Sequence, residues 1–240
     1  SVSRAEGPIA TLSMGGQAAA SNWPGGSYDP ETHTLFVAST RSVGTFGLVP
    51  PAPGRADGVP YHQGTVLSGA RTSGGSGAGG STPRPEGASA SGSAPLTAQG
   101  LPLIKPPYSR ITAVDMDKGE FRWQVPFGET PDAIKNHPAL KGLNIPRTGQ
   151  ASLSIGNMLT KTLVVAGDSQ ITTTPEHPRG AMLRAYDQAT GKEVGNLLMP
   201  APQSGSPMTY MVNGKQYIVV AISGGNYSGE YVAYTLPDNG

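Results

Sequence analysis

Two short stretches of the chain repeat one arrangement of apolar and polar positions. They are residues 111–123 (ITAVDMDKGEFRW) and residues 183–195 (LRAYDQATGKEVG). The shared positions are Ala113, Asp115, Gly119 and Trp123 in the first copy and Ala185, Asp187, Gly191 and Gly195 in the second. Alternating apolar residues on both sides of a turn-forming segment predict strand, tight turn, strand. Two copies of this unit favour a β-propeller or a β-solenoid over a chance pair of hairpins.

Each shared position has a physical role. The apolar residues of the first strand would pack between sheets, and the Asp would accept hydrogen bonds from the backbone of the turn. The Gly would take the turn position that needs a positive φ. Trp123 would cover the neighbouring sheet with its large flat ring. The second copy carries Gly195 at that place, so we expect other side chains to fill the corresponding junction.

The first fifty residues predict further strands and turns. A short strand is expected at residues 9–13 and a stronger one at residues 35–39 (LFVAS). Between them, residues 22–26 (NWPGG) form a glycine-rich lead-in, and residues 29–32 (DPET) form a turn with Pro at its second position. Together these segments predict a hairpin of the kind found at the inner strands of a propeller blade.

Residues 50–100 interrupt this pattern. Most of the segment is Gly, Ser, Ala and Pro, and such a composition cannot bury enough apolar surface to offset the entropy lost on ordering. We interpret it as a long surface insertion in a single propeller domain that spans residues 1–240. A linker or tolerated insertion fits the composition better than a catalytic lid does.

The rest of the chain predicts one irregular excursion and more strands. The excursion covers residues 128–150, with a helical turn expected at residues 132–136. The other expected elements are strands at 162–167, 207–212, 216–222 and 229–236, a loop at 172–180 and a two-residue turn at Asn213-Gly214. Asn-Gly between two apolar runs is the strongest short signal for a hairpin. We expect the last strand to complete a blade begun elsewhere in the ring.

The composition agrees with an all-β, turn-rich chain. It includes 34 Gly and 23 Pro among 240 residues, and the formal net charge of +1 argues against nucleic acid or an acidic membrane surface as the main partner. The absence of cysteine excludes disulfides and thiolate metal sites. No apolar run is long enough to span a bilayer, and no signal peptide is recognisable. Because the chain begins on Ser1 and not on Met, we expect a mature or processed piece.

Five blocks of sequence, in a fixed order, identify a family resemblance. They are NWPGGSYDPETHTLFVAS, KPPYSRITAVDMDKGEFRWQVP, LRAYDQATGKEV, GSPMTYMVNGKQYIVVAISGG and GEYVAYTLPD. Together they resemble the C-terminal part of the dehydrogenases that depend on pyrroloquinoline quinone (PQQ), in particular the membrane glucose dehydrogenase type. The resemblance implies an all-β fold, an eight-bladed propeller with four-stranded blades locked by tryptophan-docking repeats. This chain would form an arc of about three to four blades of that ring.

The resemblance also implies a cofactor site. In the family, PQQ lies near the propeller axis over a divalent ion, with calcium expected, or over a lanthanide. Asn22 and Trp23 match the Asn-Trp pair beside the cofactor, where an aromatic ring suits a planar quinone and an amide can bond its carbonyls. Arg147 and Thr148 fall where another loop approaches PQQ, and Arg147 could pair with a PQQ carboxylate. The alternatives are blade packing for Trp23 and a surface position for Arg147.

The residues for the reaction itself are not found in this chain. The family's catalytic Asp and most of its metal ligands lie in the N-terminal half of the enzyme, which the resemblance does not cover. No local acidic cluster replaces them, because Asp115, Asp117 and Asp187 belong to turns and Glu129, Asp132 and Glu176 are scattered in the sequence. The four histidines, which lack metal-ligand spacing and are expected in turns or facing solvent, are His33, His62, His137 and His177. We therefore assign no catalytic residue and no metal ligand here.

Two functional hypotheses follow from these observations. The favoured one is a PQQ-dependent dehydrogenase that oxidises a sugar or alcohol by hydride transfer to the quinone. A second chain would supply the N-terminal blades, the base and the metal ligands, and this chain would supply one wall of the cofactor site. The alternative is a non-catalytic, small or degenerate propeller that serves as a binding or scaffold module. The first hypothesis implies a periplasmic or extracellular location, compatible with membrane association. Because the chain has no CxxCH haem motif, it also implies a separate electron acceptor.

Overall fold

The computed structural model describes residues 11–14, 20–49, 58, 62–67, 70–73, 97–150, 155–175, 177–224 and 227–236. The chain divides into two compact units, one made of residues 1–19 and 41–105 and the other of residues 20–40 and 106–240. In the first unit, a four-stranded sheet has the order β1-β4-β5-β6, and β7 pairs with β8. The bounds are β1 (Thr11–Met14), β4 (Val43–Val49), β5 (His62–Leu67), β6 (Ala70–Ser73), β7 (Thr97–Ala98) and β8 (Leu101–Pro102).

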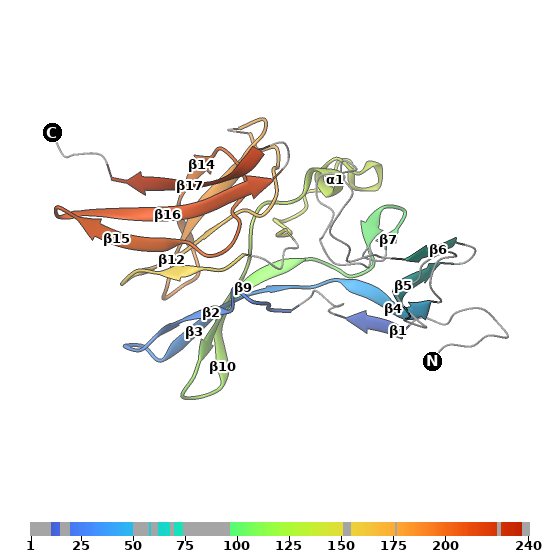
Figure 1. Ribbon diagram of the computed structural model, residues 1–240, viewed down its shortest axis with the longest axis horizontal. Helices are drawn as coiled ribbons and strands as arrows, with labels where there is room; N and C mark the ends of the chain where they lie inside the picture. The colour runs from blue at the N-terminus through green and yellow to red at the C-terminus, as the bar shows by residue number, and fades with distance from the viewer. Residues whose placement is uncertain are drawn as a thin grey trace. The chain divides into compact units, whose positions relative to one another are not determined.

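The second unit contains three antiparallel sheets, numbered here in chain order (Figure 1). The first sheet has the order β10-β9-β3-β2, with β2 (Gly26–Asp29), β3 (Thr34–Thr40), β9 (Ser109–Asp115) and β10 (Glu120–Pro126). The second has the order β11-β12-β13-β14, with β11 (Met158–Leu159), β12 (Leu163–Gly167), β13 (Ala181–Asp187) and β14 (Glu193–Met199). The third has the order β15-β16-β17, with β15 (Met208–Val212), β16 (Lys215–Gly224) and β17 (Tyr227–Thr235). A short helix α1 (Asp132–Lys135) and a 3-10 turn (Pro138–Leu140) join the first two sheets.

The two repeats form the β9–β10 and β13–β14 hairpins, as their spacing predicted. Trp123 pairs with Ala113, and Gly195 pairs with Ala185 in the same register. The turn aspartate acts as expected in both copies. Asp115 Oδ1 accepts hydrogen bonds from the backbone N–H of Asp117 and Lys118 at 3.1 and 3.2 Å. In the second copy, Asp187 Oδ1 accepts from the backbone N–H and the hydroxyl of Thr190.

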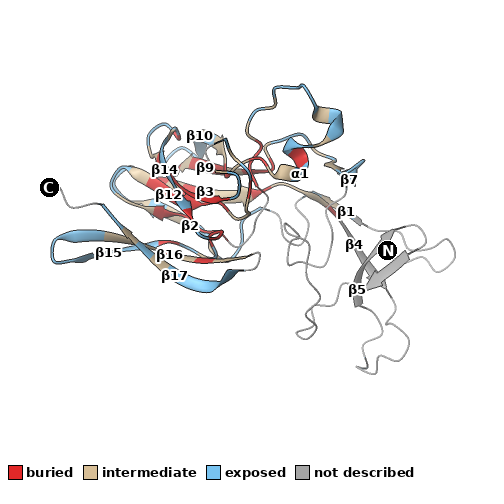
Figure 2. Ribbon diagram, turned by 90° about the horizontal axis from the view of Figure 1, so that it is seen from above, coloured by how far each residue is buried: buried red, intermediate tan, exposed pale blue. Residues whose placement is uncertain are grey.

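Two apolar clusters hold the three sheets together, and the second sheet takes part in both. The cluster between the first and second sheets consists of Phe36, Ile111, Ala113, Phe127, Ile155, Val164, Ala166 and Tyr186. The cluster between the second and third consists of Met158, Val165, Ala181, Leu183, Met199, Ala201, Val220 and Ile222. Figure 2 shows these buried positions between the sheets and the exposed ones along β15 and β17.

Trp123 crosses from the first sheet to the turn of the second. Its indole N–H donates to the backbone carbonyl of Gln188 at 2.9 Å, and its ring lies 5.6 Å from the ring of Phe36. A Cβ added to Gly191, which has φ +71°, would lie 2.7 Å from the indole carbons. Only a residue without a side chain therefore lets the ring approach this closely. The prediction that Trp123 covers the neighbouring sheet is confirmed.

The corresponding place between the second and third sheets is packed differently. A Cβ added to Gly195 would have no described atom within 4 Å. Met199, which is 2% exposed, packs in the apolar cluster between these sheets, with Tyr234 of the third sheet packed against it. Apolar side chains thus join the second and third sheets, while the expectation that they fill the place of the missing Trp at Gly195 stays a prediction.

Several local predictions are met and one is wrong. The helical turn expected at 132–136 is α1, and Asn213-Gly214, with φ 49° and 77°, joins β15 to β16. The final strand does not complete a blade begun elsewhere, because β17 pairs along its length with β16 of its own sheet. The alternating pattern of a strand shows which face is buried but not which strand is its neighbour.

The N-terminal prediction and the inserted segment fall partly outside the described residues. Residues 9 and 10 are not described, and β1 begins at Thr11 and pairs with β4. Of residues 50–100, the structure describes 58, 62–67, 70–73 and 97–100, where β5 pairs with β6 and β7 with β8. The role of this segment as a surface insertion, and the single-domain organisation, stay predictions. Among the helices that the described ranges contain, none has the length and hydropathy to cross a membrane.

Substitution of Gly191 by Ala should destabilise the second unit through the Trp123 contact. We expect a loss of about 2–3 kcal/mol in the free energy of unfolding, combining overpacking with positive-φ strain. Gly214→Ala is the matched control, because Gly214 also has a positive φ but no described atom within 4 Å of an added Cβ. The Gly214→Ala control should lose only about 1 kcal/mol in the free energy of unfolding. Urea denaturation followed by tryptophan fluorescence measures both, and equal losses would contradict the proposed packing.

Candidate functional site

The segments that lead into the first strands of the three sheets meet along one edge, which we call the inner edge. Ile155 and Gly205 form a parallel bridge, and the backbone N–H of Gly156 donates to the carbonyl of Gly205 at 3.0 Å. The buried amide of Gln203 links the same strands, because its Nε2 donates to the carbonyls of Gly156 and Gly205, both at 2.8 Å. Its Oε1 accepts from the backbone N–H of Gly167. One glutamine side chain thus joins three backbone segments at the inner edge.

Asn157 joins the first sheet to the second at this edge. Its side-chain Nδ2 donates to the carbonyl of Phe36 at 3.1 Å, and its backbone carbonyl accepts from the hydroxyl of Ser27 at 2.8 Å. Its Oδ1 is buried and has no hydrogen-bond partner among the described residues. A buried acceptor without a partner is unusual and marks a polar position at the inner edge.

Asn22 and Trp23 lie in the lead-in to β2, at the inner edge. The indole of Trp23 is 96% exposed, and Asn22 Oδ1 accepts from the backbone N–H of Trp23 at 2.9 Å. The adjacent Pro24 packs toward the second sheet, since a Cβ on Gly156 would lie 3.0 Å from its Cβ. Trp23 is therefore held at its backbone while its side chain is exposed.

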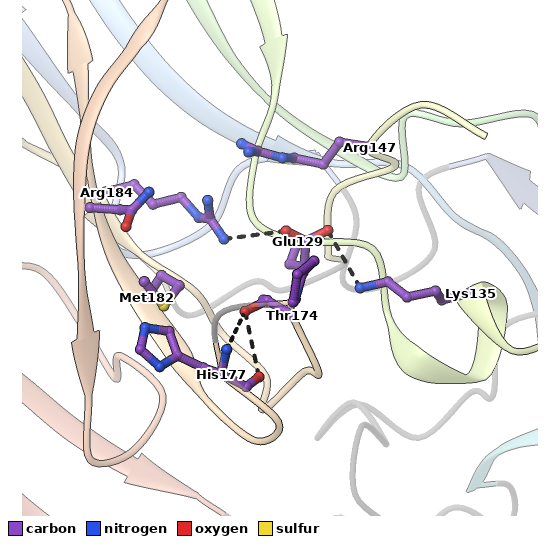
Figure 3. Close-up of a pocket in the computed structure, with 9 residues that line it drawn as sticks. Glu129, Lys135, Arg147, Thr174, His177, Met182 and Arg184 are labelled. Atoms are coloured by element: carbon purple, nitrogen blue, oxygen red, sulfur yellow. Dashed lines mark hydrogen bonds and ion pairs between the residues drawn. The ribbon is translucent and has the colours of Figure 1, made fainter. Parts of the chain in front are cut away.

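A polar pocket of about 360 Å³ lies at the end of the second sheet (Figure 3). It is lined by Glu129, Lys135, Arg147, Thr174, Pro175, His177, Met182, Arg184 and Asn196. These residues come from the excursion after β10, from the loop between β12 and β13, and from β13 and β14. Because antiparallel strands alternate in direction, these connections and the lead-in to β2 lie at the same end of the sheets.

Arg184 is the centre of a charge network beside the pocket. Its side chain is 3% exposed and makes two bonds to the fully buried Asp168, Nε to Oδ1 at 2.8 Å and Nη2 to Oδ2 at 3.0 Å. Its Nη1 donates to both carboxylate oxygens of Glu193 at 3.0 and 3.1 Å. Glu129 lies between two cations, 3.7 Å from Arg184 and 3.8 Å from Lys135 (Figure 3). Arg147 completes the network by pairing with Glu193.

Burial and pairing shift the pKa values of this network in different directions. Burial raises the pKa of Asp168, and the guanidinium of Arg184 opposes that rise. Burial alone would lower the pKa of Arg184, but the hydrogen bond and charge of Asp168 raise it. Burial also pushes the pKa of Glu193 upward, but hydrogen bonds from Asn196 and Arg147 outweigh it, so that this pKa lies below its usual value. The pKa shifts of Arg184 and Glu193 therefore favour their charged forms, whereas burial disfavours the charged form of Asp168.

The four residues assigned to a cofactor from the sequence fall at two different places. Asn22 and Trp23 are together at the inner edge. Arg147 belongs instead to the charge network, through Glu193. Thr148 is 1% exposed, and its backbone N–H and hydroxyl bond within the chain, to Thr130 and Gly149. A cofactor role for each of these four residues stays a prediction.

Sequence reasoning missed the residues that organise both places. Arg184 and Glu193 lie within the second repeat, at positions that the repeat pattern does not single out, and Asp168 precedes Arg184 by 16 residues. Gln203 and Asn157 look like ordinary loop residues. Glu129 was regarded as scattered, but it lies beside Arg184. His33 and His137 occupy turn positions as expected, whereas His177 lines the pocket. Within the described ranges, no three His, Asp or Glu side chains are grouped so that they could hold a metal ion.

Comparison with known proteins defines the family. Residues 5–218 match the sequence family described as PQQ: Glucose/ethanol/alcohol dehydrogenase, beta-propeller domain. The chain therefore belongs to this family of PQQ-dependent dehydrogenase propellers, and the predicted resemblance is confirmed. Its stacked antiparallel sheets are part of a propeller domain of that kind.

Three relatives show the extent of the match. The chain is 34% identical over 153 residues to the probable quinate dehydrogenase (quinone) of Xanthomonas campestris pv. juglandis, covering 60% of this chain and 18% of that protein. It is 33% identical to quinoprotein glucose dehydrogenase A of Acinetobacter calcoaceticus, covering 61% and 18%. It is 35% identical to the quinate/shikimate dehydrogenase (quinone) of Acinetobacter baylyi (strain ATCC 33305 / BD413 / ADP1), covering 59% and 17%. The chain thus spans less than a fifth of the length of these curated relatives.

Removing one partner of the buried Asp168–Arg184 ion pair should lower the free energy of unfolding more than removing both. Asp168→Asn leaves Arg184 without its buried counter-charge, and we expect a loss of about 3–5 kcal/mol in the free energy of unfolding. The double variant Asp168→Leu, Arg184→Met should recover most of that loss, because no unpaired charge remains buried. Asp117→Asn, at a side chain that is 67% exposed, serves as the control and should change stability by less than about 1 kcal/mol. Urea denaturation of the four proteins provides the measurement, and a double variant as unstable as Asp168→Asn would contradict this account.

Glu193 should make stability depend on acidic pH. Its folded-state pKa lies below the ordinary value of 4.5, so the ionised form favours the folded state above that pH, and the contribution is lost as the pH falls. The urea midpoint of the unaltered protein should therefore decrease on acidification from about pH 7 to about pH 3. Glu193→Gln should flatten that decrease, whereas Glu120→Gln, at an exposed position of β10, should not. Parallel curves for all three proteins would show that Glu193 has no such role.

Proposed function

We propose that this chain supplies one wall of the cofactor site in a PQQ-dependent dehydrogenase that oxidises a sugar or an alcohol. The observation that carries the proposal is the exposed indole of Trp23 at the inner edge, in a chain that belongs to this family. An exposed Trp held by a bonded backbone offers a flat apolar face at little further entropic cost. The curated relatives include enzymes named for glucose, quinate, shikimate and glycerol, which agrees with a hydroxylated substrate.

The residues at the inner edge fit a planar quinone in part. Trp23 would stack on the ring system, and the amide of Asn22 would bond to a carbonyl at its rim. Asn157 Oδ1 is a buried acceptor at the same edge that has no partner among the described residues. When bound, PQQ would supply the two-electron acceptor for the substrate C–H hydride. Arg147 pairs with Glu193 and Thr148 is buried, and contacts of these two residues with PQQ stay a prediction.

The open face of the third sheet supports the need for further blades. The second sheet is covered on both faces, whereas the third sheet exposes apolar side chains such as Met208 (52%) and Tyr231 (80%). Unpaired apolar faces of this kind are a liability in water unless another element covers them. We therefore propose that a second chain, or the rest of a longer one, completes an eight-bladed ring. That partner would carry the catalytic base and the ligands of a calcium-like or lanthanide ion.

Two further parts of this proposal follow from the family alone. A periplasmic or extracellular location and a separate electron acceptor stay predictions. The alternative function, a non-catalytic degenerate propeller, draws on Gly195 in place of the second Trp. Native mass spectrometry separates the two, since a stable monomer of 24.6 kDa with no affinity for PQQ would favour the scaffold module.

Titration with PQQ tests the cofactor wall directly. The chain has two tryptophans, so the indole N–H resonance of Trp23 can be followed by NMR beside that of Trp123. We expect PQQ to shift the Trp23 resonance, and Trp23→Ala to weaken binding by about tenfold, the scale of one aromatic stack. Phe121→Ala removes another exposed aromatic side chain, one that is 66% exposed, and should leave PQQ binding unchanged. An unshifted Trp23 resonance at saturating PQQ would refute the proposal.

A further inference from the structure

The polar pocket at the end of the second sheet is faced by more cations than carboxylates. Among the described residues, its charged lining consists of Lys135, Arg147, Arg184 and Glu129 (Figure 3). The carboxylates of Asp168 and Glu193 do not line the cavity, and they accept hydrogen bonds from all three guanidinium nitrogens of Arg184. Arg184 is therefore committed to the network, and the donors that a ligand can use belong to the other two cations.

Arg147 and Lys135 both have donors left for a ligand. Arg147, whose side chain is 36% exposed, uses only Nη1 in its hydrogen bonds to the described residues, for Glu193. Lys135, 35% exposed, donates to the carbonyl of Thr173 at 2.6 Å, and its distance of 3.8 Å to Glu129 is longer than a hydrogen bond. Because a guanidinium and an ammonium each carry several N–H groups, both side chains can also bond to a carboxylate in the pocket.

The same pocket offers two open acceptors. Glu129 Oε1 accepts from the backbone N–H of Thr130 at 2.9 Å, whereas Oε2 lies 3.7 Å from Arg184 Nη2, beyond hydrogen-bond distance. Asn196 donates from Nδ2 to Glu193, which leaves its Oδ1 as the acceptor end of the amide. Hydroxyl groups of a ligand can donate to such oxygens. The lining therefore suits a molecule that has both a carboxylate and hydroxyls.

Hydrogen bonds between the segments that form the pocket hold it in shape. Asp132 of α1 accepts from the backbone N–H and the hydroxyl of Thr173, both at 2.8 Å. Lys135, at the other end of α1, donates to the carbonyl of the same threonine. Three hydrogen bonds thus fix the excursion after β10 to the loop between β12 and β13. A site assembled in advance loses less entropy on binding, and a volume of about 360 Å³ is in the usual range for small ligands.

We propose that this pocket is a binding site for a small hydroxy acid. The ligand's carboxylate would accept hydrogen bonds from Arg147 and Lys135. Its hydroxyls would donate to Glu129 Oε2 and Asn196 Oδ1, and the side chain of Met182, which also lines the cavity, would contact its carbon atoms. This inference goes beyond the proposed function and does not depend on it, because it involves neither PQQ nor the residues at the inner edge.

Three probes of similar length test this chemistry on the unaltered chain. Gluconate carries a carboxylate and a row of hydroxyls, sorbitol has a hydroxymethyl group in place of the carboxylate, and hexanoate has the carboxylate without hydroxyls. Each is titrated at constant ionic strength, because exposed cations attract any anion weakly. We expect gluconate to shift the backbone NMR resonances of Thr174 and His177, which line the pocket, and to bind at least about tenfold more tightly than sorbitol or hexanoate.

Variants of the chain locate the contact. Arg147→Gln and Lys135→Gln should each weaken gluconate binding by about tenfold, the scale of one hydrogen bond to a charged group. Lys141→Gln removes a cation at an exposed position of the same excursion and should leave binding unchanged. The proposal would be overturned if gluconate left the pocket resonances unshifted, bound no better than sorbitol or hexanoate, or was insensitive to both Arg147→Gln and Lys135→Gln. An equal loss on Lys141→Gln would show non-specific ion pairing and would also overturn it.

PQQ is the competing ligand, because Arg147 is also predicted to contact it. Displacement of gluconate by PQQ, followed at Thr174 and His177, would assign the pocket to the quinone and would contradict the hydroxy-acid site. The resonance of Trp23 reports separately on the cofactor wall. Failure of the hydroxy-acid site and failure of the proposed function are therefore told apart.

Discussion

The contact on which the second unit depends is the indole of Trp123 against the bare backbone of Gly191. Trp123 belongs to the first copy of the repeat, and Gly191 belongs to the second. The ring adds apolar area between two sheets, and its N–H is satisfied by the carbonyl of Gln188, so the large side chain is placed without leaving a buried donor unpaired. Because the glycine has a positive φ and no side chain, the turn can present its backbone directly to the ring. This contact joins the first sheet to the turn of the second, beside the apolar cluster that the two sheets share.

The second sheet combines two kinds of stabilisation that do not compete. Along its faces the contacts are apolar, and at one end they are ionic. Arg184 is surrounded by Asp168, Glu193 and Glu129, so its buried charge is matched. A buried ion pair of this kind contributes little net free energy to stability compared with an apolar core. It nevertheless tolerates few substitutions, because the loss of one partner leaves the other charge in a medium that solvates it poorly. The network therefore fixes how the excursion after β10 sits on the second sheet.

The chain belongs to a family of enzymes yet spans less than a fifth of its curated relatives. The structure is consistent with that partial extent. Its middle sheet is covered on both faces, and its outer sheets expose apolar rows that have buried counterparts inside the same molecule. Trp23 and Asn22 lie at the inner edge of the first sheet, where the lead-in to β2 begins.

The sequence alone was sufficient for the hairpins, the two repeat units, the Asn213-Gly214 turn and the family, because these depend on local alternation, turn chemistry and residues close together in the chain. Tertiary structure alone decided which sheets share a core, that β17 pairs with β16, and that Arg147 meets Glu193 while Thr148 is buried. It also brought Asp168, Arg184 and Glu129 into one network. The shared cores and the Arg147–Glu193 and Glu129–Arg184 pairs join residues that are distant in sequence, whereas β16 and β17 follow one another in the chain. In both cases the side-chain pattern of a single strand contains no information about the strand or charge that will lie beside it. Local chemistry therefore determined the elements, and long-range packing determined their partners.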